Sequence, residues 1–71
     1  MRKEEKFSGK IISIFPKGSG LELRVLLNKE NKEELKLYNR KRDDKMERGL
    51  FISGFYDPLS KEIIEYTLTE D

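Results

Sequence analysis

Residues 21–27 (LELRVLL) place an apolar side chain at every second position, and this alternation constrains the fold more than any other feature of the chain. Leu21, Leu23, Val25 and Leu27 share one face, and Glu22, Arg24 and Leu26 share the other. A repeat of two residues is the period of a strand with one buried face. The sequence therefore predicts a half-buried β-strand at this place.

Four more segments have strand character, judged by β-branched and aromatic residues or by the same alternation. They are residues 7–15, 34–38, 50–56 and 62–69. In the second of these, Leu35 and Leu37 are predicted to face the core, and Lys36 and Tyr38 the solvent. A helix over 30–38 is the alternative, because Glu, Lys and Leu favour helices. In the last segment, the residues predicted to share one face are Ile64, Tyr66 and Leu68.

The first segment, residues 7–15, interrupts its alternation in the middle. Phe7, Gly9 and Ile11 share one face, whereas Ile12 and Ile14 fall on the other. A β-bulge near Ile11–Ser13 would insert one residue and return both sets to the core. Gly9 suits a sharp bend of the kind that closes a small barrel.

The orientation of the fourth segment, residues 50–56, decides where its two phenylalanines lie. If Leu50 and Ile52 face the core, Phe51 and Phe55 project outward. A bulge at Gly54 would instead turn both rings inward. The sequence leaves both registers open.

Residues 39–48 (NRKRDDKMER) connect the third and fourth strands and contain one apolar residue, Met46. Asp43 is suited to cap a short helix in this connector, and Gly49 to end it in a left-handed conformation. The predicted order is therefore three hairpin-linked strands, a short helix or loop, and a two-stranded hairpin.

This order resembles an oligonucleotide/oligosaccharide-binding (OB) fold, as do the Gly9-x-Ile11-x-x-Ile14 pattern and the glycines Gly49 and Gly54 of the fourth strand. The resemblance implies an all-β, OB-like, five-stranded small barrel. We expect it to cover residues 1–71 as a single domain, with residues 1–6 and 70–71 frayed. An SH3-like barrel is the alternative.

The composition argues against several classes of function. The chain has no histidine and no cysteine, so disulfides and the usual zinc sites are excluded. Its adjacent acids, Glu33-Glu34 and Asp43-Asp44, lie in polar segments, without the burial that tunes catalytic carboxylates. We therefore expect no enzyme activity, no cofactor and no metal. Without a long apolar run or a signal peptide, a cytoplasmic protein with no membrane contact is expected.

Basic and aromatic residues form the candidate binding site. Charged residues make up 41% of the chain, but the net charge is only +1, because 15 basic residues face 14 acidic ones. The two kinds are unevenly placed, with basic residues in excess at 36–48 and acidic ones at 57–71. The candidate residues are Arg24, Lys36, Tyr38, Arg40, Arg42 and Phe51. Since aromatic rings stack on bases while cations follow phosphates, the expected partner is single-stranded DNA or RNA, bound by a monomer.

Two other interpretations stay open. One is a module that binds a protein partner by adding a strand or docking an aromatic patch. The other is a de novo designed small β-barrel with no evolved activity. A Lys- and Glu-rich surface, the absence of Cys, His and Trp, and glycines at bend positions favour the designed barrel.

Overall fold

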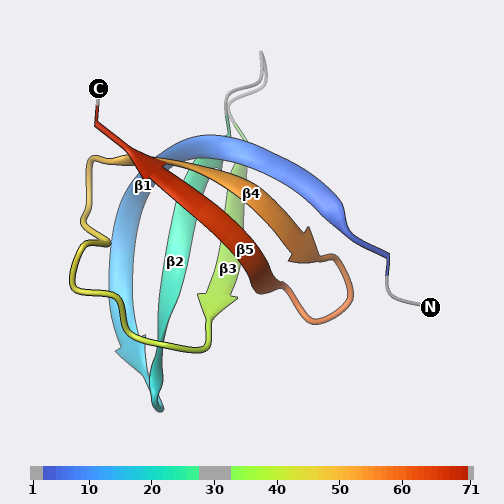
Figure 1. The fold of residues 1–71 in the computed structure, drawn as a ribbon, viewed down its shortest axis with the longest axis horizontal. Helices are drawn as coiled ribbons and strands as arrows, with labels where there is room; N and C mark the ends of the chain where they lie inside the picture. The colour runs from blue at the N-terminus through green and yellow to red at the C-terminus, as the bar shows by residue number, and fades with distance from the viewer. Residues whose placement is uncertain (1–2, 28–32, 71) are drawn as a thin grey trace.

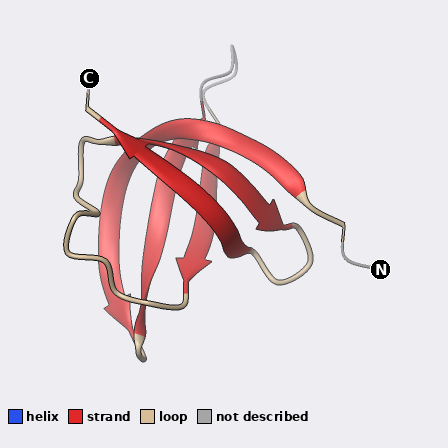
Figure 2. Cartoon of the chain, in the orientation of Figure 1, coloured by secondary structure: helices blue, strands red, loops and turns tan. Residues whose placement is uncertain are grey.

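The computed structural model describes residues 3–27 and 33–70, and in this part of the chain all regular structure is β-strand (Figures 1 and 2). The strands are β1 (Glu5–Lys17), β2 (Gly20–Leu27), β3 (Glu34–Asn39), β4 (Phe51–Asp57) and β5 (Glu62–Thr69). They close into a barrel in the order β1-β2-β3-β5-β4, with β4 paired back to β1. The predicted all-β, five-stranded small barrel is confirmed. The polar run at 28–33 (NKENKE) predicts a loop tip, and residues 28–32 of this run lie outside the described part of the chain.

Strand β1 is long and bent, and it closes the barrel by pairing with two neighbours. Its first half pairs with β4, and its second half pairs with β2. The register shifts between Ile11 and Ser13, so the predicted bulge is confirmed. Gly9 lies where the two pairings overlap, and a Cβ atom on it would come within 2.2 Å of the Leu26 carbonyl oxygen. Only glycine therefore allows β1 and β2 to approach this closely.

The core fills the barrel with apolar side chains from all five strands. The fully buried residues are Ile11, Leu23, Val25, Leu37 and Ile52. Phe7 packs edge-on against Tyr56 with ring centroids 5.8 Å apart. Inward Leu35 and Leu37 confirm the predicted orientation of β3, and the strand excludes a helix over its residues.

The connector between β3 and β4 has no helix, so that alternative for residues 43–48 is wrong. Asp43 instead caps a turn, in which its Oδ1 accepts a hydrogen bond from the Lys45 amide at 2.9 Å. Gly49 has the predicted left-handed conformation, with φ of 101°. Met46, the apolar anchor of the connector, is buried in the core. One buried side chain in a run of charged residues does not stabilise an amphipathic helix.

Strands β4 and β5 settle the orientation of the aromatic segment. Ile52 is buried and Leu50 packs against the core, so Phe51 and Phe55 stand half-buried on the outer side. A bulge opposite Phe55 and Tyr56 shifts the start of β5. As a result Ile63 is buried and Ile64 is 37% exposed, so the predicted common face of Ile64 with Tyr66 and Leu68 is wrong.

Strand β1 begins at Glu5, earlier than predicted. Glu5 and Lys6 pair with Tyr56 and Phe55 of β4 and are not part of a frayed end. Within residues 3–27 and 33–70, no helix has the length and apolar character needed to cross a membrane.

Candidate nucleic-acid interface

The outer surface of β2, β3 and the second half of β1 carries the candidate interface, which we call the β1–β3 face. Strand register arranges its side chains in two rows that cross the three strands. One row, the cationic row, consists of Ser13, Arg24 and Lys36. The next, the aromatic row, consists of Phe15, Glu22 and Tyr38. Alternation along β2 and β3 turns Leu23 and Leu37 inward and Glu22, Arg24, Lys36 and Tyr38 outward, whereas Ser13 Oγ of β1 is buried.

The cationic row places two positive charges side by side. Arg24 and Lys36 are direct cross-strand partners, and both are exposed. Like charges at such positions repel each other, because their Cβ atoms lie about 4.5–5.5 Å apart. Lys36 Nζ is 3.8 Å from the Glu22 carboxylate, whereas Arg24 has no ion pair among the described residues. This row is therefore a place where an anion would relieve repulsion.

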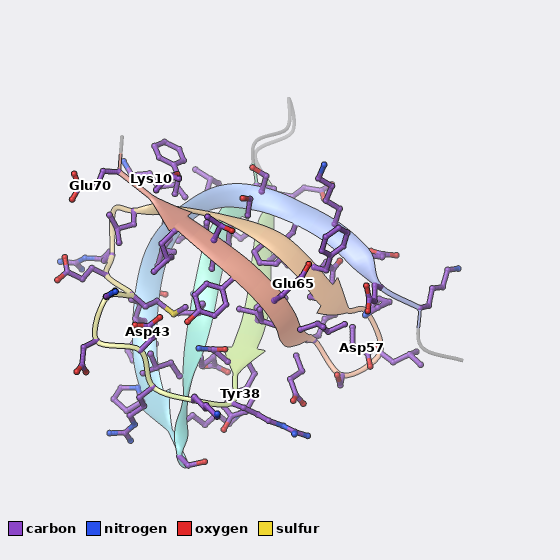
Figure 3. The ribbon with its side chains drawn as sticks, viewed as in Figure 1. Lys10, Tyr38, Asp43, Asp57, Glu65 and Glu70 are labelled. Carbon is purple, nitrogen blue, oxygen red and sulfur yellow. The ribbon has the colours of Figure 1, made fainter. Side chains whose placement is uncertain are left out.

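The aromatic row offers two rings with an acid between them. Phe15 is 55% exposed, which is unusual for so large an apolar side chain. Tyr38 is half-buried, and its hydroxyl donates a 3.2 Å hydrogen bond to the Lys17 carbonyl. Figure 3 shows Tyr38 at the end of β3, close to the loop that continues into the connector. Glu22 lies between the rings and is 3.7 Å from Lys17 Nζ.

An open hollow of about 540 Å³ extends the face from β2 and β3 toward the β4–β5 turn. Its polar lining comprises Lys17, Glu22, Glu34, Lys36, Tyr38, Ser60 and Lys61. Three lysines and one tyrosine thus surround a space large enough for a nucleotide-sized group, with two acids, Glu22 on β2 and Glu34 on β3, also in its lining.

The connector carries two of the predicted binding residues, Arg40 and Arg42. Only Arg42 borders the β1–β3 face. Arg42 Nη2 donates a 3.1 Å hydrogen bond to the Gly18 carbonyl, which places its guanidinium beside the β1–β2 turn. Arg40 Nε lies 2.5 Å from the Glu62 carboxylate. Arg40 is therefore already paired with an acid, and its charge is less available to a ligand than that of Arg24.

The connector that carries both arginines is fastened to β5 by Asp43. The Tyr66 hydroxyl donates a hydrogen bond to Asp43 Oδ2, and Asp43 Oδ1 accepts one from the Lys45 amide. The Tyr66 bond and then the amide bond hold the pKa of Asp43 below its ordinary value. Burial, followed by the bond to Asp43, raises the pKa of Tyr66. The two groups thus favour a neutral phenol beside an ionised carboxylate.

Phe51 does not belong to the β1–β3 face. It lies on β4 with Lys10 and Thr69 as cross-strand partners. In the closed order, β1 separates β4 from β2, and β5 separates it from β3. The outward orientation of Phe51 agrees with one predicted register. However, barrel closure places its ring on a different side from Arg24, Lys36 and Tyr38.

Sequence reasoning missed Phe15 and Lys17 as parts of the face. The predicted bulge between Ile11 and Ser13 contained the necessary signal. A bulge returns Ile14 to the core, and the next residue, Phe15, must then point outward. Lys17 belongs to the face because its Nζ contacts Glu22, and this contact forms only when β1 and β2 pair in the hairpin.

Comparisons with protein-family models, with curated proteins and with solved structures find no match for this chain. Within residues 3–27 and 33–70, no group of three or more acidic side chains is placed to hold a metal ion. The candidate site therefore depends on the geometry of the β1–β3 face alone.

Proposed function

We propose that the protein binds single-stranded nucleic acid across the β1–β3 face. The observation that carries this proposal is the direct pairing of Arg24 with Lys36, two exposed cations whose repulsion a phosphate would remove. Phe15 and Tyr38, one row away, supply rings on which bases can stack. Cations beside aromatic rings are the combination that single strands require.

The strand order supports assigning the barrel to the OB type. Strand β1 pairs antiparallel with β4, and β3 meets β5 in parallel at Tyr38 and Glu62. OB barrels bind oligonucleotides on the face of their second and third strands, between the loops that follow the first and fourth strands. Here Arg42 lies at the first of these loops and Lys61 in the second. Because one fold hosts many functions, this assignment supports the location of the site more than the identity of its ligand.

Glu22 would modulate such binding. Its carboxylate is within 4 Å of both Lys17 and Lys36, so it partly neutralises the cations that would meet phosphates. It is also a hydrogen-bond acceptor for the amino groups of bases stacked on the neighbouring rings. We therefore expect modest affinity, with salt sensitivity set by a small number of phosphate contacts.

Fluorescence anisotropy with short labelled DNA and RNA oligonucleotides at low salt tests the proposal. Binding should weaken with salt by a slope of about −0.7 per neutralised phosphate. Arg24→Ala should reduce both the affinity and this slope, whereas Lys10→Ala, which removes an exposed cation beside Phe51, should change neither. Equal loss from both variants would place the ligand elsewhere, and absence of binding by the parent chain would exclude the proposal.

The two rings give a second, independent readout. Phe15→Leu and Tyr38→Leu should each weaken binding by about 1–3 kcal/mol per stacked base, with an unchanged salt slope. Phe51→Leu is the matched control, because its ring lies outside the β1–β3 face. Amide chemical shifts that change on β2 and β3 but not on β4 would support the same location.

The alternatives predict different results. A designed barrel without evolved activity would be thermally very stable and show no response to oligonucleotide. A protein-binding module would retain a partner that oligonucleotide does not displace. The absence of cysteine suits a reducing compartment, and we propose the cytoplasm as the location of the protein.

A further inference from the structure

The seam between β3 and β5 leaves one strand edge largely unpaired. Strand β2 accompanies β3 along its length, but β5 meets β3 at a single position, Tyr38 with Glu62. There the Tyr38 amide donates a 2.8 Å hydrogen bond to the Lys61 carbonyl. Within the described part of the chain, no strand pairs with residues 34–37 on this side. Figure 1 shows β5 running at an angle to β3.

The backbone groups exposed at this edge belong to Glu34 and Lys36. Odd-numbered positions bond toward β2, since the Leu27 amide donates to the Glu33 carbonyl at 2.8 Å. Even-numbered positions bond away from β2, as Tyr38 does. Glu34 and Lys36 therefore each direct an N–H and a C=O outward. Such a row is a template for another strand.

We propose that two copies of this chain associate by pairing their β3 edges antiparallel around a two-fold axis at Leu35. In this register Glu34 of each copy lies opposite Lys36 of the other, and each pair exchanges two backbone hydrogen bonds. Four backbone bonds and two pairs of opposite charges form together. Glu34 has no ion pair among the described residues, so its carboxylate is available to the second copy.

Other antiparallel registers are unfavourable. An axis at Lys36 would place the two lysines opposite each other and would require the amide of Tyr38, which is already bonded. An axis at Glu34 would oppose two glutamates. Like charges at directly opposite positions are destabilising. The alternation of acid and base along β3 therefore selects one register, and that register is self-complementary.

Apolar contact between the two copies at the two-fold axis also favours this register. Leu35 lies half-buried at one end of the barrel, beside an open hollow of about 240 Å³ that is also lined by Phe7, Leu27 and Tyr56. In the proposed register the two Leu35 residues form a non-hydrogen-bonded pair, whose Cα atoms are about 4.5 Å apart. Each leucine would thus cover the hollow of the other copy.

The dimer is expected to be transient. A single short strand pair buries far less than the roughly 1,200 Å² typical of stable interfaces. The monomer expected from the sequence is then the form at low concentration. Pairing leaves the outer side chains of β3 in solvent and joins the two β1–β3 faces into one sheet. Because residues 34–37 also line the hollow of about 540 Å³, we expect a second copy to compete with any ligand that fills that hollow.

Sedimentation equilibrium up to about 1 mM protein tests the proposal. The average mass should rise with concentration for the parent chain. Glu34→Lys and Lys36→Glu should each raise the dissociation constant about tenfold, because both charge pairs become repulsive. The double variant E34K/K36E should restore it to near the parent value. Glu65→Lys, an equal change of charge on exposed β5, should have no effect.

The amide signals of Glu34 and Lys36 give a readout that does not rely on substitution. Both should shift with protein concentration, and their hydrogen exchange should slow. Circular dichroism melting would verify that each variant folds. A mass that stays monomeric over the whole range would overturn the proposal. A dimer that E34K leaves unchanged, or that the double variant fails to restore, would also overturn it, because the interface would then lie elsewhere.

Discussion

The Tyr66 hydroxyl donates a hydrogen bond to Asp43 Oδ2 at 2.5 Å, and this bond fastens the connector to β5. The residues are 23 positions apart, so the bond closes a large part of the chain onto the barrel. It holds the connector beside the core at the point where Asp43 also caps its turn. Arg42, next in sequence to Asp43, is itself bonded to the Gly18 carbonyl, so the connector is attached both to β5 and to the β1–β2 turn.

Tyr66→Phe should lower the free energy of unfolding by about 1–2 kcal/mol, because a hydrogen bond to a carboxylate is lost from a partly exposed site. Urea titration at neutral pH measures the change. Tyr38→Phe is the matched control, since its hydroxyl makes only an exposed bond to the Lys17 carbonyl. It should cost less than 1 kcal/mol. Equal effects of the two substitutions would show that the Asp43 bond contributes no special stability.

The same pair predicts how stability depends on pH. The pKa of Asp43 is lowered from an ordinary value of 3.8. Its stabilising contribution is therefore complete above pH 3.8 and is lost as the pH falls through the lowered pKa. Burial raises the pKa of Tyr66 and of Tyr56 above 10.0, so their contribution is complete below pH 10 and is lost as the pH rises through the raised values.

Urea midpoints measured from acid to alkaline pH test this dependence. Tyr66→Phe should flatten both limbs, because it removes the phenol and also releases the pKa of Asp43. Tyr38→Phe should leave the acid limb unchanged, because its hydroxyl bonds to a backbone carbonyl and not to a carboxylate. If the urea midpoint of Tyr66→Phe falls as steeply at acid pH as that of the parent chain, carboxylates other than Asp43 cause the loss of stability there.

The local pattern of the sequence was sufficient to predict the barrel and much of its interior. The alternation in β2 and β3 correctly placed Leu23 and Leu37 in the core. One irregular alternation correctly placed the bulge of β1 next to Ile11. These features depend on side-chain periodicity, which is a property of neighbouring residues.

The features that could not be predicted depend on how distant strands meet. One of the two predicted registers turned Phe51 outward, and the structure has this orientation. However, β4 pairs with β1, and this pairing places Phe51 on a different side of the barrel from Tyr38. The bulge that exposes Ile64 arises from the register of β5 against β4. Arg40 was expected to be available for a ligand, and its pairing with Glu62 arises only where β3 meets β5.

Met46 anchors the charged connector in the core. This side chain should therefore account for much of the connector's contribution to the stability of the barrel. The side chain is only 5% exposed. Met46→Ala should therefore cost about 2–4 kcal/mol through lost contacts and the space left behind. Leu59→Ala is the control, because Leu59 is 93% exposed in the β4–β5 turn and should cost almost nothing. A cost below about 1 kcal/mol for Met46→Ala would mean that the connector contributes little to closing the core.

Glu22 provides the sharpest test of how the β1–β3 face treats a phosphate backbone. Its carboxylate lies within 4 Å of Lys17 and Lys36, and glutamine keeps its size without its charge. Glu22→Gln should tighten oligonucleotide binding severalfold at low salt and make the salt slope steeper, because both lysines are then free to meet phosphates. Glu65→Gln, which removes an exposed acid on β5, should not change binding. Weaker binding by Glu22→Gln would contradict the electrostatic role and assign the carboxylate to base recognition.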